Sequence, residues 1–115
     1  MTLSSGTEVN LKQIAQDCGL FSNAEISVVT DNIDNLKNSY NGKTLINIYN
    51  YMLIHATEPD VIMHLIRCLD MYRDSSSLEF LVDILLLKNA NSAEPEIREK
   101  YVNVRVMCAK AIANQ

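Results

Sequence analysis

Two histidines and two nearby carboxylates are the residues of this sequence best suited to metal binding or acid–base chemistry. His55 and His64 flank a turn that carries Glu58 and Asp60. Imidazole and carboxylate groups bind zinc and act as general acids and bases, so a small helical enzyme is one hypothesis. The histidines are nine residues apart in different expected helices, which matches no recognised ligand motif. We expect His55 to end its helix as a cap or interface residue and His64 to lie on a solvated polar face.

The cysteines give no stronger indication of a catalytic or metal site. Cys18, Cys68 and Cys108 form an odd, widely spaced set with apolar or small neighbours. A disulfide framework or a zinc knuckle uses paired and more closely spaced cysteines. A reactive thiolate needs an electropositive and partly exposed setting. We therefore expect three inert, buried thiols in a reducing cytosol.

The segment Asn41-Gly42-Lys43-Thr44 resembles the end of a phosphate-binding loop. The full motif needs another glycine five residues before Gly42, where Lys37 stands, and a preceding strand, for which the sequence has no pattern. We interpret Asn41-Gly42 as a helix stop between two helices. The sequence thus predicts a non-enzymatic protein with no catalytic, cofactor-binding or metal-binding residues.

Composition and charge narrow the class of protein. The chain has 115 residues, of which 48% are hydrophobic and 21% are charged, as in a single globular domain. Its net charge is -4 and its pI is about 5.0, which disfavours binding to the phosphates of nucleic acids. The N-terminus lacks the pattern of a signal peptide, and no apolar run approaches the ~20 residues of a membrane span. We expect a cytoplasmic protein that binds neither nucleic acids nor membranes.

Helix-start signals and apolar periodicity indicate an all-α protein. A hydroxyl followed three residues later by a carboxylate, the pattern of a capping box, precedes an apolar run at Ser22–Glu25, Thr57–Asp60 and Ser76–Glu79. Apolar residues recur at helical spacing after these boxes. Residues 44–56 are apolar nearly all round, which predicts a central helix covered on both sides. We expect helices at about 8–18, 23–38, 43–56, 58–73, 77–88 and 94–113, the last one broken near Val102.

Two segments 43 residues apart carry the same pattern of apolar and small residues. Val61-Ile-Met-His-Leu65-Ile66-Arg-Cys68-Leu69 aligns with Val104-Arg-Val-Met-Cys108-Ala109-Lys-Ala111-Ile112, and a Glu-Pro-acid turn precedes each segment. A period of ~40–47 residues built from helix pairs is typical of the HEAT/armadillo class. Residues 43–113 resemble this class, because Val104-Arg105 followed by small residues is similar to the second helix of a HEAT repeat.

The resemblance implies a short HEAT-like stack of about six helices in antiparallel pairs. Residues 1–115 would form a single domain, with N-terminal capping helices in 1–40 and HEAT-like pairs in 41–115. Stacked pairs bury a continuous core and leave a ridge of helices as a binding face. A compact helical bundle unrelated to this class is the alternative fold.

Carboxylates in the middle of the chain predict a docking surface for a basic protein. The residues expected to form it are Glu58, Asp60, Asp70, Asp74, Glu79 and Asp83. Such a surface raises association rates and contributes to specificity, although a solvated face without a partner is the simpler alternative. In size, charge and simplicity the chain resembles the immunity proteins of bacterial toxins, which implies an inhibitor of a basic toxin such as a nuclease. The alternative is a HEAT-like accessory or adaptor module of a larger assembly, similar to bilin lyase subunits.

Overall fold

The computed structural model describes residues 11–87 and 95–114, and all regular structure in these ranges is helical. Within them every helix is too short or too polar to cross a membrane. The expected all-α class is confirmed. After a helical segment at residues 11–17, the elements are α2 (Ile26–Asn35), η1 (Leu36–Asn38), α3 (Gly42–His55), α4 (Pro59–Tyr72), η2 (Ser75–Ser77), α5 (Leu78–Leu87) and α6 (Pro95–Ala113).

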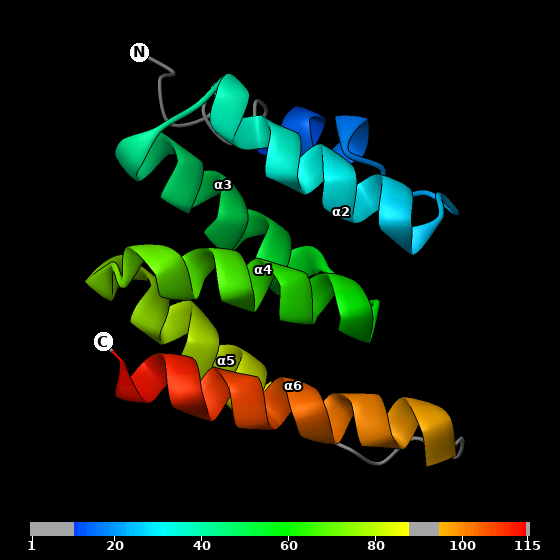
Figure 1. The fold of residues 1–115 in the computed structure, drawn as a ribbon, viewed down its shortest axis with the longest axis vertical. Helices are drawn as coiled ribbons and strands as arrows, with labels where there is room; N and C mark the ends of the chain where they lie inside the picture. Colours follow the sequence, from blue (N-terminus) through cyan, green and yellow to red (C-terminus); the bar gives the residue numbers. More distant parts are fainter. Residues whose placement is uncertain (1–10, 88–94, 115) are drawn as a thin grey trace.

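The labelled α-helices lie in two layers (Figure 1). α2, α4 and α6 run side by side in one layer, and α3 and α5 cross behind them. The packing agrees, since α4 contacts α2, α3 and α6, while α5 contacts α3 and α6. Asp60, near the start of α4, binds Lys100 near the start of α6, and Asp70, near the end of α4, binds Asn114 just after α6. α4 and α6 are therefore parallel.

The register of α4 against α6 is close to the period seen in the sequence. The hydrogen bonds between them join residues 40 and 44 apart. Val61 and Val104, which the 43-residue period aligns, are both buried. Ala109 departs from the pattern, because it is exposed whereas the aligned Ile66 is buried. The period therefore corresponds to a real neighbour relation between two parallel helices.

The hydrophobic core lies between the two layers. α3 contacts both α4 and α5, and half of its residues are buried. Asn47 and other residues on one side of α3 stay exposed, so the expected cover on both sides is only partial. Burial of one large apolar side chain contributes about 1.5–3 kcal/mol. The largest fully buried side chains are Ile33, Leu45, Ile48, Met52, Leu53, Ile62, Leu65, Ile66, Leu69, Leu81, Ile84 and Val104.

The first predicted capping box does not form. Ser22 Oγ accepts a hydrogen bond from the Ala24 N–H and donates one to the Gly19 carbonyl, so it closes a separate turn. α2 consequently begins at Ile26, later than predicted, with Glu25 as an N-cap residue whose side chain makes no cap hydrogen bond.

The other two predicted boxes are also wrong in detail. Glu58, rather than Thr57, is the N-cap residue of α4, and its side chain makes no cap hydrogen bond. Before α5 it is Asp74 that accepts the Ser76 N–H, and a short 3-10 turn precedes the helix. The break predicted near Val102 is absent, because α6 runs unbroken through that residue. The helix ends predicted at residues 8, 88 and 94 lie outside the described residues.

Candidate functional site

Two of the predicted docking carboxylates contact α6. Lys100 Nζ donates a hydrogen bond to Asp60 Oδ2 at 2.8 Å, and Asn114 Nδ2 donates to Asp70 Oδ1 at 3.1 Å. The contact with the Asp60 carboxylate raises the pKa of Lys100. Asp60 and Asp70 therefore help to hold α6 against α4, and an intramolecular cation already neutralises the charge of Asp60.

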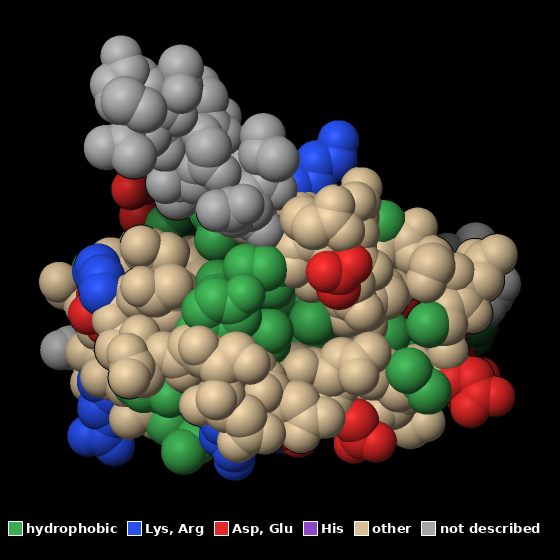
Figure 2. All heavy atoms as spheres, turned by 90° about the horizontal axis from the view of Figure 1, so that it is seen from above, with side chains coloured by type: hydrophobic (Ala, Val, Ile, Leu, Met, Phe, Trp, Pro, Cys, Tyr) green, Lys and Arg blue, Asp and Glu red, His purple; other side chains and the backbone are tan. Residues whose placement is uncertain are grey.

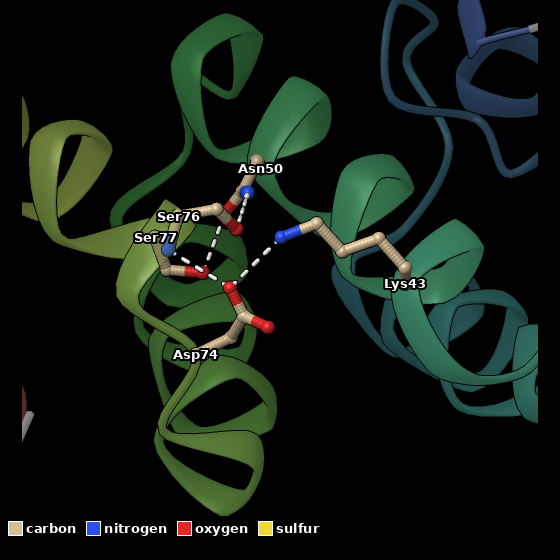
Figure 3. Close-up of polar contacts among 5 residues, drawn as sticks. All are labelled: Lys43, Asn50, Asp74, Ser76 and Ser77. Carbon is tan, nitrogen blue, oxygen red and sulfur yellow. Dashed lines mark hydrogen bonds and ion pairs between the residues drawn. The ribbon is translucent and has the colours of Figure 1, made fainter.

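A third predicted carboxylate, Asp74, belongs to a polar cluster in the turn before α5 (Figure 3). Its Oδ1 accepts hydrogen bonds from the Ser76 N–H at 2.8 Å and from Lys43 Nζ at 3.0 Å. Hydrogen bonds from Ser76, together with the ion pair to Lys43, lower the pKa of Asp74 to about 2. Asp74 thus caps η2 and joins this turn to the start of α3.

Two buried polar side chains complete the cluster. Asn50 of α3 is 3% exposed and Ser77 of η2 is fully buried. Ser77 Oγ donates a hydrogen bond to Asn50 Oδ1 at 2.8 Å, and Asn50 Nδ2 lies 3.5 Å from Ser76 Oγ (Figure 3). Every buried side-chain nitrogen or oxygen in the described part of the chain has a partner. The cluster therefore connects α3 to the turn before α5 without leaving a polar atom unsatisfied.

The remaining predicted carboxylates form no ion pair with another described residue. Glu58 is exposed just before α4, whereas Glu79 and Asp83 lie on α5 in the other layer. Leu81 and Ile84 of α5 are buried, whereas Glu79 is exposed and Asp83 is half-buried. Glu79 and Asp83 are four residues apart on one side of α5, which lies in a different layer from α4.

An open groove of about 600 Å³ lies between the helical segment at residues 11–17, α3 and the start of α5. Its lining mixes apolar rings with amide, hydroxyl and ammonium groups: Leu11, Lys12, Asn47, Asn50, Tyr51, Ser76 and Phe80. Asn50 and Ser76 belong to the polar cluster, so hydrogen bonds to buried side chains hold one wall of the groove in place. Asp83 follows Phe80 by one helical turn, which places a carboxylate near the edge of the groove.

The end of the molecule that carries α2 has a different character. Figure 2 shows hydrophobic side chains in the middle of this face, with acidic and basic side chains scattered around them. Phe21 and Val28, from this part of the chain, are about half exposed, at 48% and 46%. The acidic side chains among the described residues of this face therefore form no continuous surface.

His64 lies between α2 and α4, and the prediction of a solvated polar-face residue is wrong. Its Nε2 is 2.7 Å from Oδ1 of Asp34, and its side chain is only 22% exposed because α2 packs on this side of α4. Cys68 lies one turn further along α4. The imidazole, the thiol and the Asp34 carboxylate have ligand atoms within 4.8 Å of one another. Tyr49 of α3 donates a hydrogen bond to the Cys68 sulfur.

The thiols of the three cysteines are free and have raised pKa values. Burial and the nearby Asp34 carboxylate raise the pKa of Cys68 to about 11. Burial raises the pKa of Cys108 to about 12, and burial together with Asp17 raises that of Cys18. A protonated thiol is a weak nucleophile. The prediction of buried thiols is confirmed for Cys18 and Cys108, whereas Cys68 is only partly buried.

His55 ends α3, as predicted, but does not join the group around His64. It is exposed and packs on aromatic rings, with its centroid 4.4 Å from that of Tyr51. The sequence hypothesis grouped His64 with the wrong residues, since its neighbours are Asp34 and Cys68 rather than His55, Glu58 and Asp60. Two of the three residues, His64 and Cys68, have a signal in the sequence, because residues four apart share one face of a helix.

The chain matches no protein-family model, no curated protein and no solved structure. The HEAT-like and immunity-protein resemblances therefore stay predictions, and function is inferred below from the side chains themselves.

Proposed function

We propose that the chain is a non-enzymatic protein-binding domain whose partner is a basic polypeptide. The observation that carries this proposal is the open groove of about 600 Å³ beside α5. Tyr51 and Phe80 line it, and aromatic side chains bury a large area while losing few rotamers. Asn47, which is exposed in the same groove, has both a donor and an acceptor for the backbone of a bound segment.

The charge around the groove supports a basic partner. Glu79 and Asp83 flank Phe80 on α5, and the whole chain carries a net charge of -4. Carboxylates near an apolar contact attract Lys and Arg residues and raise the association rate. Lys12 contributes a positive charge on the side of the helical segment at residues 11–17. The basic residues of the partner are therefore expected to lie along α5.

Inhibition of a basic toxin, such as a nuclease, is the specific role that we propose. A small acidic domain fits this role because it would occupy the positively charged cleft in which such an enzyme holds its phosphate substrate. The free cysteines support action in a reducing cytosol. An accessory or adaptor module of a larger assembly is the second candidate. The parallel packing of α4 and α6 favours it, because stacked helix pairs create extended binding surfaces.

The test is affinity capture from the native host, followed by binding measurements with the recovered partner. The groove variant is Glu79→Lys/Asp83→Lys. The matched control, Asp31→Lys/Glu99→Lys, makes the same charge change at exposed positions on α2 and α6. We expect wild type and control to bind a basic polypeptide at one-to-one stoichiometry, and the groove variant to bind at least about tenfold more weakly.

A second variant, Phe80→Ala, separates the apolar contact from the charge. We expect it to shorten the lifetime of the complex, since loss of a buried aromatic contact acts mainly on dissociation. Equal affinity of wild type and both groove variants would refute the assignment of the groove. Recovery of acidic partners alone would refute the basic-polypeptide proposal. A single basic enzyme that loses activity on binding supports the inhibitor, and a multi-subunit complex supports the adaptor.

A further inference from the structure

Three side chains with different donor atoms converge where α2 packs on α4. His64 and Cys68 are four residues apart on α4, so helical geometry places them on the same face. Asp34, near the end of α2, supplies a carboxylate to the same place. The ligand atoms of all three residues lie within 4.8 Å of one another. The three ligand atoms are thus close enough to one another to bind a single ion.

The donor set matches a particular class of metal. A thiolate and an imidazole favour a borderline-soft transition metal, whereas Mg²⁺ and Ca²⁺ take sets of oxygen ligands. Zn²⁺ is bound by sulfur, nitrogen and carboxylate oxygen in tetrahedral sites, and three protein ligands leave one position for water or another group. We infer that Asp34, His64 and Cys68 form a three-ligand binding site for Zn²⁺ between α2 and α4.

The present geometry needs only a small adjustment to hold the ion. Bond lengths of about 2.0–2.3 Å place neighbouring ligand atoms in tetrahedral zinc sites roughly 3.3–3.7 Å apart. The separation of 2.7 Å between His64 Nε2 and Asp34 Oδ1 must therefore increase slightly as the ion replaces their hydrogen bond. The Asp34 side chain is 50% exposed and has room to rotate, whereas His64 is held more tightly in the packing.

Tyr49 supports the sulfur ligand from a third helix. Its side chain is 3% exposed, and its hydroxyl donates a hydrogen bond to the Cys68 sulfur. Hydrogen bonds of this kind orient metal ligands and tune the affinity of the site. Binding of the ion would release the thiol proton to solvent and form a Zn–S bond. The proton on His64 Nε2 would move through solvent to Nδ1, so that the Nε2 lone pair could bind the ion, and no oxidation state would change. The ion would then link α2 to α4 directly.

The experiment uses the full chain without an affinity tag. Zn²⁺ is titrated against a chromophoric chelator, and Co²⁺ replaces Zn²⁺ for absorption spectroscopy. The chain's two histidines provide a matched pair of variants, His64→Gln and His55→Gln, because His55 is exposed and outside the group. We expect one Zn²⁺ per chain in wild type and His55→Gln, and at least about tenfold weaker binding in His64→Gln. The Co²⁺ form should show a thiolate-to-metal charge-transfer band that Cys68→Ser abolishes.

Asp34→Asn tests the site without disturbing the core, because Asp34 is exposed. Circular dichroism should show that it keeps its helix content, while the rise in melting temperature that Zn²⁺ gives to wild type becomes smaller. Failure of wild type to compete with the chelator for Zn²⁺ would overturn the inference. Equal binding by His64→Gln and His55→Gln, or a Co²⁺ spectrum without the charge-transfer band, would also overturn it.

Discussion

The hydrogen bond between Asn50 and Ser77 predicts a measurable coupling between α3 and the turn before α5. These two residues are the buried polar residues of the described part of the chain, at 3% and 0% exposure, and they bind each other at 2.8 Å. Removal of one partner leaves a buried polar atom of the other unsatisfied. Removal of both side chains leaves no unsatisfied atom. The stability lost in the double variant should therefore be smaller than the sum of the losses in the two single variants.

The magnitude follows from the burial of the pair. An unsatisfied buried polar group costs about 1–3 kcal/mol. We expect Asn50→Ala to lower the free energy of unfolding by about 2 kcal/mol, because the buried Ser77 hydroxyl loses its hydrogen-bond acceptor. Ser77→Ala leaves Asn50 Oδ1 without its donor but keeps the contact of Asn50 Nδ2 with Ser76, so it should cost somewhat less, about 1–2 kcal/mol. The double variant should lose about as much as Asn50→Ala alone, which gives a coupling energy of at least about 1 kcal/mol.

Urea unfolding followed by circular dichroism measures this coupling as a double-mutant cycle. For a chain of 115 residues, a loss of about 2 kcal/mol corresponds to a melting temperature about 8 °C lower. The control is Asn103→Ala, an exposed asparagine on α6, which should change stability by less than about 0.5 kcal/mol. The double variant could instead lose as much stability as the two single variants together, to within about 0.5 kcal/mol. That result would show that the buried pair does not act as a unit.

Three further predictions concern pH, backbone strain and thiol reactivity. The pKa of Asp74 is lowered to about 2, so its stabilising contribution should be complete above about pH 4 and lost as the pH falls towards 2. Urea unfolding between these pH values should show a weaker acid dependence in Asp74→Asn than in wild type. Arg73 ends α4 with a positive φ of 50°, so Arg73→Gly should raise the free energy of unfolding, by up to about 1 kcal/mol, in the same assay. At pH 8 iodoacetamide should label native Cys68 before Cys108, and both more slowly than in the unfolded chain, because their pKa values are raised to about 11 and about 12. Peptide mapping that finds Cys108 labelled first would contradict the burial assigned to it.

The helices of this protein are predictable because local periodicity determines most of them. The expected helices at 43–56 and 58–73 differ by one residue at each end from α3 and α4. Helix starts were less predictable, since one hydroxyl can satisfy several competing backbone groups. Ser22 illustrates this competition: its Oγ closes a turn with Gly19 and Ala24 instead of capping α2.

The candidate sites depend on contacts between distant parts of the chain, which the sequence does not display. Asp34 and His64 are 30 residues apart and meet only because α2 packs against α4. The spacing of His64 and Cys68 was available from the sequence, but nothing local indicated which carboxylate would join them. The two segments that align 43 residues apart lie on α4 and α6, which pack side by side and in parallel.

The position of α4 inside its layer explains why its carboxylates are poor candidates for partner binding. α4 lies between α2 and α6, so its polar residues meet a neighbouring helix on either side. His64 contacts Asp34 of α2, while Asp60 contacts Lys100 of α6. α5 has no such neighbour for Glu79 among the described residues, and this carboxylate stays exposed.

This difference predicts opposite effects for two identical charge reversals. Asp60→Lys would face Lys100 across α4 and α6, so we expect lower stability with little change in affinity for a basic partner. Glu79→Lys lies on the exposed side of α5, so we expect lower affinity with little change in stability. Urea unfolding and titration of the partner measure both quantities for both variants. Asp60→Lys could instead weaken partner binding as much as Glu79→Lys does while the fold stays intact. The partner would then contact Asp60 despite its ion pair with Lys100, and the binding surface would extend to α4.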